Sequence, residues 1–257
     1  MSELKTSVVN APIWVDLSST DAAGAREFYG KLFGWTAEPE KDPAAGGYAI
    51  ARLNGKDVAG IGGQMDPNAP SAWTIYIGAK DAAAVAKKVE AEGGKVVAPP
   101  FDVMDVGRMA VFQDPAGAFI AVWEPKSMPG FAVQDKPSSF AWAELSARGL
   151  DKAKPFYKKV FGWGEKVSPM GEMGDYTEFK INDQSIAGAM EMNPNVPHQV
   201  PSYWMVYFGV ADVDGAHKKA ISLGAQERVR PAEYPGGRFS VLADPQGAMF
   251  GLLQTGK

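Results

Sequence analysis

The sequence predicts an α+β fold made by tandem duplication, with four β-α-β-β-β units along the chain. The first observation is a repeat: Trp14-Val-Asp16-Leu returns as Trp142-Ala-Glu144-Leu, at an offset of 142 − 14 = 128. The second is that matching positions continue to the end of each copy, with only two or three residues inserted. Insertions this small belong in loops, so the two copies share one architecture.

The first copy opens with a strand and a capped helix. Ile13–Leu17 alternates in strand fashion. Asp21 supplies an N-cap for a helix over Ala22–Phe33, where apolar residues recur at helical spacing. Gly34 ends this helix, because glycine readily adopts the left-handed conformation found at helix C-termini.

Two strands complete the first unit as a hairpin. Tyr48–Leu53 and Val58–Ile61 are joined by Asn54 and Gly55. Both residues tolerate positive φ, which a tight hairpin turn requires at its two central positions.

A second unit follows with the same order. Trp73–Ile77 is a strand, Asp81 is a cap, Ala82–Glu92 is a helix, and Gly93 stops it. The strands that complete the unit are Lys95–Ala98, Met109–Gln113 and Ala118–Trp123. The second copy reproduces each step, with Asp212 as cap, Gly224 as stop and a turn at Asp244-Pro-Gln-Gly247.

The two copies are expected to be separate domains. Residues 126–139 are rich in Pro, Gly, Ser and charge, which is typical of a linker. This predicts one domain over residues 8–125 and another over residues 140–256. Each is long enough to bury a core of its own.

The composition excludes several classes of protein. The formal net charge of −4 offers no basic surface for nucleic acid. No apolar run approaches the roughly 18 residues that span a bilayer, and the first residues lack the apolar core of a secretion signal. Zero cysteines exclude disulfides and thiolate chemistry. We therefore expect a cytoplasmic protein without a nucleic-acid or membrane partner.

The repeated motifs resemble the vicinal oxygen chelate superfamily, which includes glyoxalase I, extradiol dioxygenases and the bleomycin-resistance proteins. The resemblance lies in Phe-Tyr followed by Phe-Gly-Trp, in the glycine helix stops, and in Gly-Arg followed by Asp-Pro-x-Gly near the end of each copy. The duplicated Trp-x-(Asp/Glu)-Leu start is similar to two-domain actinobacterial members with glyoxalase-like or hydroxylase names. The resemblance implies that the four units form two cupped, barrel-like sheets.

The resemblance also implies a divalent metal inside each cup, held by His and Glu side chains at four strand positions. These positions correspond to Trp14, Ile50, Thr74 and Ala121 in the first copy, and to Trp142, Glu178, Met205 and Gly251 in the second. Only Glu178 has a side chain of the required kind. Because zinc, nickel and non-haem iron centres need several His and carboxylate ligands together, we expect no intrinsic metal and no cofactor.

A carboxylate is predicted to face the interior of each cup. Side chains two apart on a strand share one face, so Asp16 lies beside Trp14, and Glu144 lies beside Trp142. A buried carboxylate needs a partner.

The repeated arginines Arg108 and Arg238 are candidate partners, because a guanidinium fits a carboxylate bidentately. Three roles stay open for the carboxylates: an ion pair that locks the domain, recognition of an amine or hydroxyl on a ligand, or general-base catalysis by Asp16 or Glu144. The predicted ligand-binding residues are Trp14, Asp16, Tyr76, Arg108, Trp123, Trp142, Glu144, Glu178, Tyr207 and Arg238.

The two histidines have simpler explanations. His217 is expected to be a solvated residue on an outer helix, and His198 a loop residue, with contact to a ligand at the pocket mouth as its alternative. Trp35 and Trp163 follow helices and are expected to fill the space between helix and sheet.

The favoured hypothesis is a metal-free protein that binds a planar or aromatic small molecule in an aromatic-lined cup. One alternative is an enzyme, a glyoxalase-like lyase or an oxidoreductase such as a hydroxylase or dioxygenase. It would use Asp16 or Glu144 as a base, or a metal gathered by Glu144, Glu178 and His198. Another is a scaffold with filled cups. Either a monomer or a homodimer is compatible with the sequence.

Overall fold

The computed structural model describes residues 9–171 and 174–256. The first copy folds into β1 (Pro12–Ser19), α1 (Ala22–Phe33), η1 (Pro43–Ala45), β2 (Ala49–Leu53), β3 (Lys56–Gly63), β4 (Ala72–Gly78), α2 (Ala82–Ala91), β5 (Lys95–Val103), β6 (Gly107–Gln113) and β7 (Phe119–Pro125).

The second copy folds into β8 (Phe140–Ala147), α3 (Leu150–Phe161), β9 (Gly164–Pro169), β10 (Asp175–Ile181), β11 (Gln184–Glu191), β12 (Tyr203–Gly209), α4 (Val213–Ser222), β13 (Gln226–Tyr234), β14 (Gly237–Ala243) and β15 (Met249–Thr255). The α+β class and the tandem repeat are confirmed. The predicted domain start at residue 8 lies outside the described residues.

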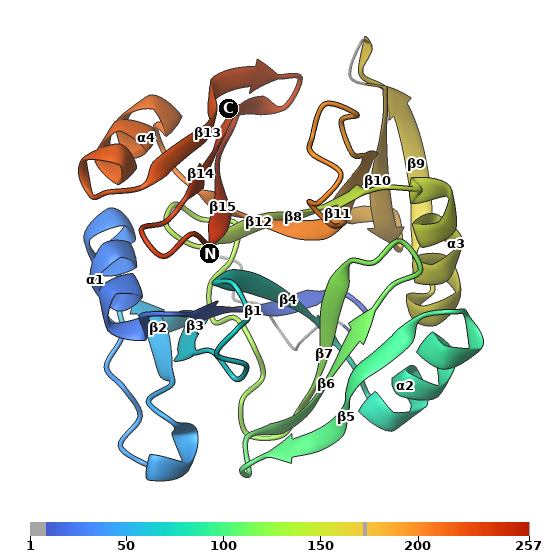
Figure 1. Ribbon diagram of the computed structural model, residues 1–257, viewed down its shortest axis with the longest axis horizontal. Coiled ribbons are helices and arrows are strands. Elements are labelled where there is room, and N and C mark those ends of the chain that lie inside the picture. Colours follow the sequence, from blue (N-terminus) through green and yellow to red (C-terminus); the bar gives the residue numbers. More distant parts are fainter. Residues whose placement is uncertain (1–8, 172–173, 257) are drawn as a thin grey trace.

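Each copy forms one curved mixed sheet. The strand orders are β2-β3-β1-β4-β7-β6-β5 and β13-β14-β15-β12-β8-β11-β10-β9. The two units of a copy meet along an antiparallel pair, β1 with β4 and β8 with β12. Figure 1 shows the sheets back to back, with their concave sides turned away from each other. The two cups are therefore present, but each sheet keeps free edge strands and neither closes into a barrel.

The predicted local signals have the expected geometry. Asp21 accepts a hydrogen bond from the backbone N–H of Gly24, and Gly34 is left-handed at the end of α1. Asn54 and Gly55 both have positive φ in the β2–β3 turn. The first unit has the two strands expected after its helix, one fewer than the β-α-β-β-β order that the other three units follow. Pro39, which has no backbone N–H, lies in the intervening segment, where only isolated bridges form.

Aromatic side chains hold the two copies together in a shared core. The Tyr29 hydroxyl accepts a hydrogen bond from Trp73 Nε1 at 2.9 Å and donates one to Asp244 Oδ2 at 3.0 Å. The second copy mirrors this chain with Trp204, Tyr157 and Asp114, at 2.9 and 2.8 Å. Each helix tyrosine thus binds the Asp-Pro-x-Gly turn of the other copy. All six side chains are buried, so the two copies fold against each other.

The predicted packing role of Trp35 and Trp163 is confirmed. Both are buried, and their indole N–H groups donate to the carbonyls of Ser138 and Asn10. Among the described residues, no helix is long and apolar enough to cross a membrane.

Candidate functional site

The floor of the first cup carries a chain of polar contacts. Trp14 Nε1 donates to the Tyr48 hydroxyl at 3.1 Å. The Asp16 carboxyl lies beside this tyrosine and interacts with the Tyr76 hydroxyl. Gly60 makes room for the arrangement, because a Cβ at that position would lie 1.8 Å from the Tyr48 oxygen. A tryptophan, a carboxyl and two tyrosines therefore converge in this cup.

The Asp16 carboxyl is a weak acid in this setting. Burial raises its pKa from 3.8 to about 7, and the Tyr76 hydroxyl offsets part of that rise by stabilising the charged form. Proximity to the Asp16 charge in turn adds to the effect of burial in raising the pKa of Tyr48 and of Tyr76. Asp16 can therefore exchange a proton near neutral pH, whereas both tyrosines stay protonated as donors.

The second cup repeats the pattern around Glu144. Trp142 Nε1 donates to the Tyr176 hydroxyl at 2.9 Å, and the Tyr207 hydroxyl donates to Glu144 Oε1 at 3.4 Å. The Tyr176 hydroxyl is directed at the same carboxyl. Burial raises the pKa of Glu144, and the two tyrosines counteract this only in part. Glycine again makes space, since a Cβ on Gly251 would overlap the Tyr207 ring.

Two more tyrosines border Glu144 and were missed by the sequence prediction. Tyr203 bonds to Ser146 and Tyr234 packs edge-on against Phe239, and the charge of Glu144 contributes to raising the pKa of both. Tyr203 opens β12 directly before the buried Trp204, so strand alternation alone places it on the cup face. Tyr234 ends β13, where no repeat signal marks it.

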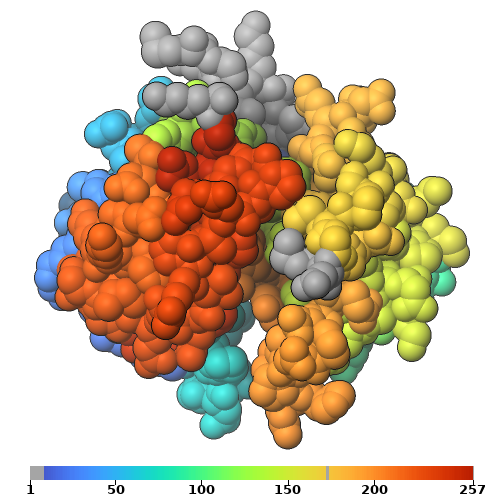
Figure 2. Space-filling view, turned by 90° about the horizontal axis from the view of Figure 1, so that it is seen from above, coloured from blue at the N-terminus to red at the C-terminus, as the bar shows by residue number. Residues whose placement is uncertain are grey.

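The apolar part of the second floor is separate from the main core. It is a small cluster of Met205, Tyr207 and Val241, packed with the partly exposed side chains of Trp142, Tyr203, Phe239, Met249 and Leu253. Figure 2 looks onto the open side of this sheet and shows a furrow between the strands β13–β15 and the strands β9–β11. Trp142, Tyr203, Phe239, Met249 and Leu253 are therefore reachable from outside, while Met205, Tyr207 and Val241 beneath them are buried.

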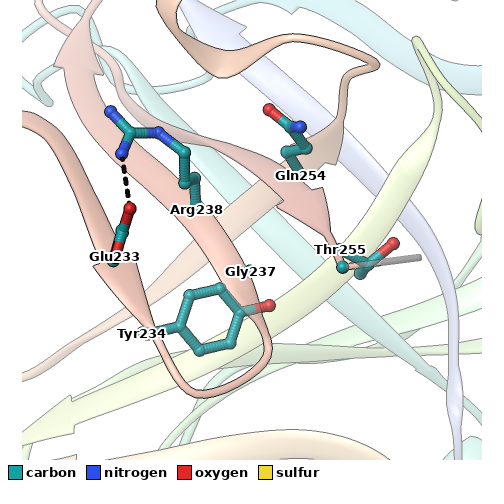
Figure 3. Close-up of a pocket in the computed structure, with 7 residues that line it drawn as sticks. Glu233, Tyr234, Gly237, Arg238, Gln254 and Thr255 are labelled. Atoms are coloured by element: carbon teal, nitrogen blue, oxygen red, sulfur yellow. Dashed lines mark hydrogen bonds and ion pairs between the residues drawn. The ribbon is translucent and has the colours of Figure 1, made fainter.

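The predicted ion pairs between the arginines and the cup carboxylates are wrong. Arg238 is paired with Asp214 of α4 at 3.1 Å and with Glu233 at 3.3 Å. It lies on the helix-covered face, because its neighbour Phe239 faces the cup and side chains alternate along a strand. Figure 3 shows Arg238 and Glu233 at the edge of a shallow pocket of about 240 Å³.

Arg108 follows the same rule in the first copy. Its Nη2 donates to the Pro100 carbonyl at 3.4 Å, and the Trp123 ring covers the neighbouring Gly107 on the opposite face. The arginine's sheet partner Glu124 caps α2 through the Ala82 N–H. Tyrosines, not arginines, therefore accompany both carboxylates.

Glu178 lies on the cup face of the second sheet, but its contacts are with residues of neighbouring strands. It accepts a hydrogen bond from Ser185 and lies 3.6 Å from the ammonium of Lys166. These contacts lower its pKa, the Ser185 hydroxyl having the largest effect.

The structure separates the two histidines. His198 is an exposed loop residue, as one of its alternatives predicted. The prediction of a solvated His217 is wrong: the ring is buried against β13, and its Nε2 lies 3.0 Å from Glu227. Its spacing from the buried Val213 and Ala220 on α4 explains why it faces inward.

The residues present do not fit the metal that the resemblance implies. Strand pairing puts Trp14, Tyr76 and Ala121 in one row across the first cup, and Trp142, Tyr207 and Gly251 in one row across the second. Indole and aliphatic groups do not bind zinc or iron, and a phenol binds them only after losing its proton, which the raised pKa of Tyr76 and of Tyr207 opposes. Within residues 9–171 and 174–256, no three His, Cys, Asp or Glu side chains are grouped to hold a metal ion, and this includes Glu144, Glu178 and His198.

Relatives of known sequence match almost the whole chain. The anthracycline biosynthesis protein DnrV of Streptomyces peucetius is 38% identical over an alignment of 258 positions, which covers 95% of this chain and 93% of the relative. CFP32 of Mycobacterium tuberculosis, to which a glyoxylase name is provisionally attached, is 39% identical over 249 residues, covering 95% and 94%.

Solved structures show the same fold at low sequence identity. The Mn(II)-bound glyoxalase from Novosphingobium aromaticivorans is 18% identical with a TM-score of 0.66, and the match covers 96% of this chain and 82% of that one. The 2,2′,3-trihydroxybiphenyl 1,2-dioxygenase of Sphingomonas wittichii strain RW1 is 15% identical with a TM-score of 0.67, covering 97% and 92%.

The sequence pattern of one family matches both copies, at residues 12–122 and 139–252. Each matched range corresponds to one of the two curved sheets, and the alignment with the relatives above covers nearly the full chain. The chain belongs to the glyoxalase/bleomycin resistance protein/dioxygenase superfamily.

Proposed function

We propose that the protein binds a planar aromatic small molecule in a cup, without a metal held by its own side chains. The observation that carries this proposal is the floor of the second cup, where Glu144, Tyr176 and Tyr207 converge beside partly exposed aromatic and apolar side chains. A few polar groups among apolar walls are typical of a small-molecule site.

The aromatic rings and the Glu144 carboxyl recognise different parts of the ligand. The indole of Trp142 and the phenol rings offer flat surfaces for stacking. The Glu144 carboxyl accepts a hydrogen bond from an amine or hydroxyl at the ligand's edge, since its oxygens can accept more bonds than the two tyrosines supply. Two relatives named as anthracycline biosynthesis proteins support this ligand class, because anthracyclines are planar fused-ring molecules.

Binding is tested with 2-(hydroxymethyl)anthraquinone, a planar tricycle with one hydroxyl at its edge, by calorimetry and tryptophan fluorescence. We expect saturable binding that weakens about tenfold in Trp142→Ala, since the floor loses its largest stacking surface. Metal analysis of protein purified without a histidine tag accompanies it. Stoichiometric nickel, zinc or iron, or no binding of the probe, would contradict the proposal.

A second candidate function is general-base catalysis in the first cup. It is favoured by the Asp16 carboxyl, whose pKa of about 7 suits proton transfer at neutral pH. The glyoxylase name attached to CFP32 points the same way. Conversion of the hemithioacetal of methylglyoxal and glutathione, lost in Asp16→Asn and retained in Glu144→Gln, would establish this function in place of the first.

A further inference from the structure

The first cup is closed at one end by the linker. The backbone N–H groups of Lys126 and Met128 donate to the Val106 carbonyl on one wall of the cup. Further along the linker, the N–H of Phe131 donates to the Ile13 carbonyl of the central strand β1, and the N–H of Ala132 donates to the Asp57 carbonyl of β3, on the other wall. The linker therefore bridges both walls of the first sheet.

One side chain of this bridge, that of Phe131, packs into the first cup. The Phe131 ring packs on Trp14 with centroids 5.6 Å apart, and Trp123 donates its indole N–H to the Met128 carbonyl. Trp14, Tyr76 and Trp123 are all buried and continuous with the main core of the protein. These three aromatic side chains thus offer little surface to a ligand, whereas Asp16 on the same floor is half-buried.

The second cup has smaller and more exposed contents. The position of Trp123 corresponds to Leu253, because 253 − 123 = 130, the offset of the Asp-Pro turns. Leu253 and Trp142 are both partly exposed in a cluster apart from the main core. Contiguous exposed apolar surface in a concave site is typical of a place where a ligand binds.

Among the described residues, Glu144 has no positively charged partner. Among the ion pairs of the described residues, none includes Glu144, and the arginine that the sequence offered is paired with Asp214 and Glu233. Within the described part of the chain, the side-chain hydrogen bonds of Glu144 come from the hydroxyls of Tyr176 and Tyr207. Glu144 is half-buried. A partly desolvated carboxylate attracts an opposite charge more strongly than one in water, and aromatic faces also attract cations.

We infer that the second cup alone binds the ligand, and that it selects a planar aromatic molecule carrying a protonated amine. The ligand's ammonium group is the positively charged partner of Glu144, while the rings of Trp142 and the surrounding tyrosines bind the planar part of the ligand. This inference rests on the proposed function and adds to it the cup and the charge of the ligand.

The test compares two probes that differ in one group. 2-(Aminomethyl)anthraquinone carries an ammonium where 2-(hydroxymethyl)anthraquinone carries a hydroxyl, on the same tricycle. At about pH 7.5, where the amine is protonated, we expect one aminomethyl molecule per chain, bound at least about tenfold more tightly than the hydroxymethyl probe. The preference persists at about 0.5 M NaCl, because salt screens a partly buried ion pair much less than an exposed one.

Variants locate the source of the preference. In Glu144→Gln the two probes bind within about twofold of each other, whereas Asp16→Asn and the exposed Glu90→Gln, each of which also removes one charge, keep the preference. Glu144→Asp retains a carboxyl group, which the first cup carries at the equivalent position as Asp16, and it keeps a reduced preference. It serves as the informative variant if Glu144→Gln does not fold.

Each contrary outcome has a distinct meaning. The inference is overturned, while the proposed function stands, by any of four results. These are equal affinity for both probes, two bound molecules per chain, a preference that salt abolishes, and a preference that is lost in Asp16→Asn. If neither probe binds, the proposed function fails and the inference fails with it.

Discussion

Replacing Asp16 by Asn is expected to flatten the dependence of folding stability on pH. The wild-type carboxyl has a pKa of about 7 in the folded protein and an ordinary value of 3.8 when unfolded. Between these values the folded state holds a proton that the unfolded state has lost, so the free energy of unfolding falls as pH rises. The contribution is complete below pH 3.8 and is gone above pH 7.

The magnitude follows from the shift. About three pKa units at 1.36 kcal/mol each amount to at most about 4 kcal/mol, spread as up to about 1.4 kcal/mol per pH unit. Asn is neutral at every pH and can still accept a hydrogen bond from Tyr76. The variant is therefore expected to gain stability relative to the wild type as pH increases from about 4.5 to 7.5.

Urea unfolding at closely spaced pH values measures this difference. Glu144, Asp114 and Asp244 also have raised pKa values, but they titrate in both proteins, so their contributions cancel in the comparison. Parallel stability profiles for the wild type and Asp16→Asn would refute the reasoning, because they would show that Asp16 titrates with an ordinary pKa.

Three further outcomes are expected. Tyr29→Phe and Asp244→Asn each cost about 1–3 kcal/mol, and a double-mutant cycle gives a coupling above about 0.5 kcal/mol; additive effects would mean that their bond does not join the copies. Gly251→Ala displaces the Tyr207 ring from Glu144 and weakens probe binding in calorimetry, and an unchanged affinity would contradict the placement of that ring. Glu178→Gln changes the free energy of unfolding by less than about 0.5 kcal/mol, since its ion pair with Lys166 is exposed. A large loss of stability would indicate a role for Glu178 that its contacts do not show.

Partner choice among the polar side chains needed the tertiary structure. The motif that repeats Arg108 and Arg238 suggested a partner for each carboxylate, yet both arginines lie on the helix-covered face. The alternation of Gly237, Arg238 and Phe239 along β14 shows that Arg238 faces away from its two neighbours. The sequence did not reveal which of the two faces of β14 would meet α4. His217 is similar, because its spacing from Val213 was visible while the depth of that helix face was not.

The sequence by itself determined the duplication, the order of strands and helices, their caps and turns, and the poor match to metal ligands, because these depend on local periodicity and on residue chemistry. Only the tertiary structure decided that Tyr29 reaches Asp244, 215 positions away, and that the linker closes one cup. It also decided that tyrosines surround Glu144. Contacts of this kind depend on how two curved sheets pack, and packing depends on the shapes of side chains that are distant in the chain.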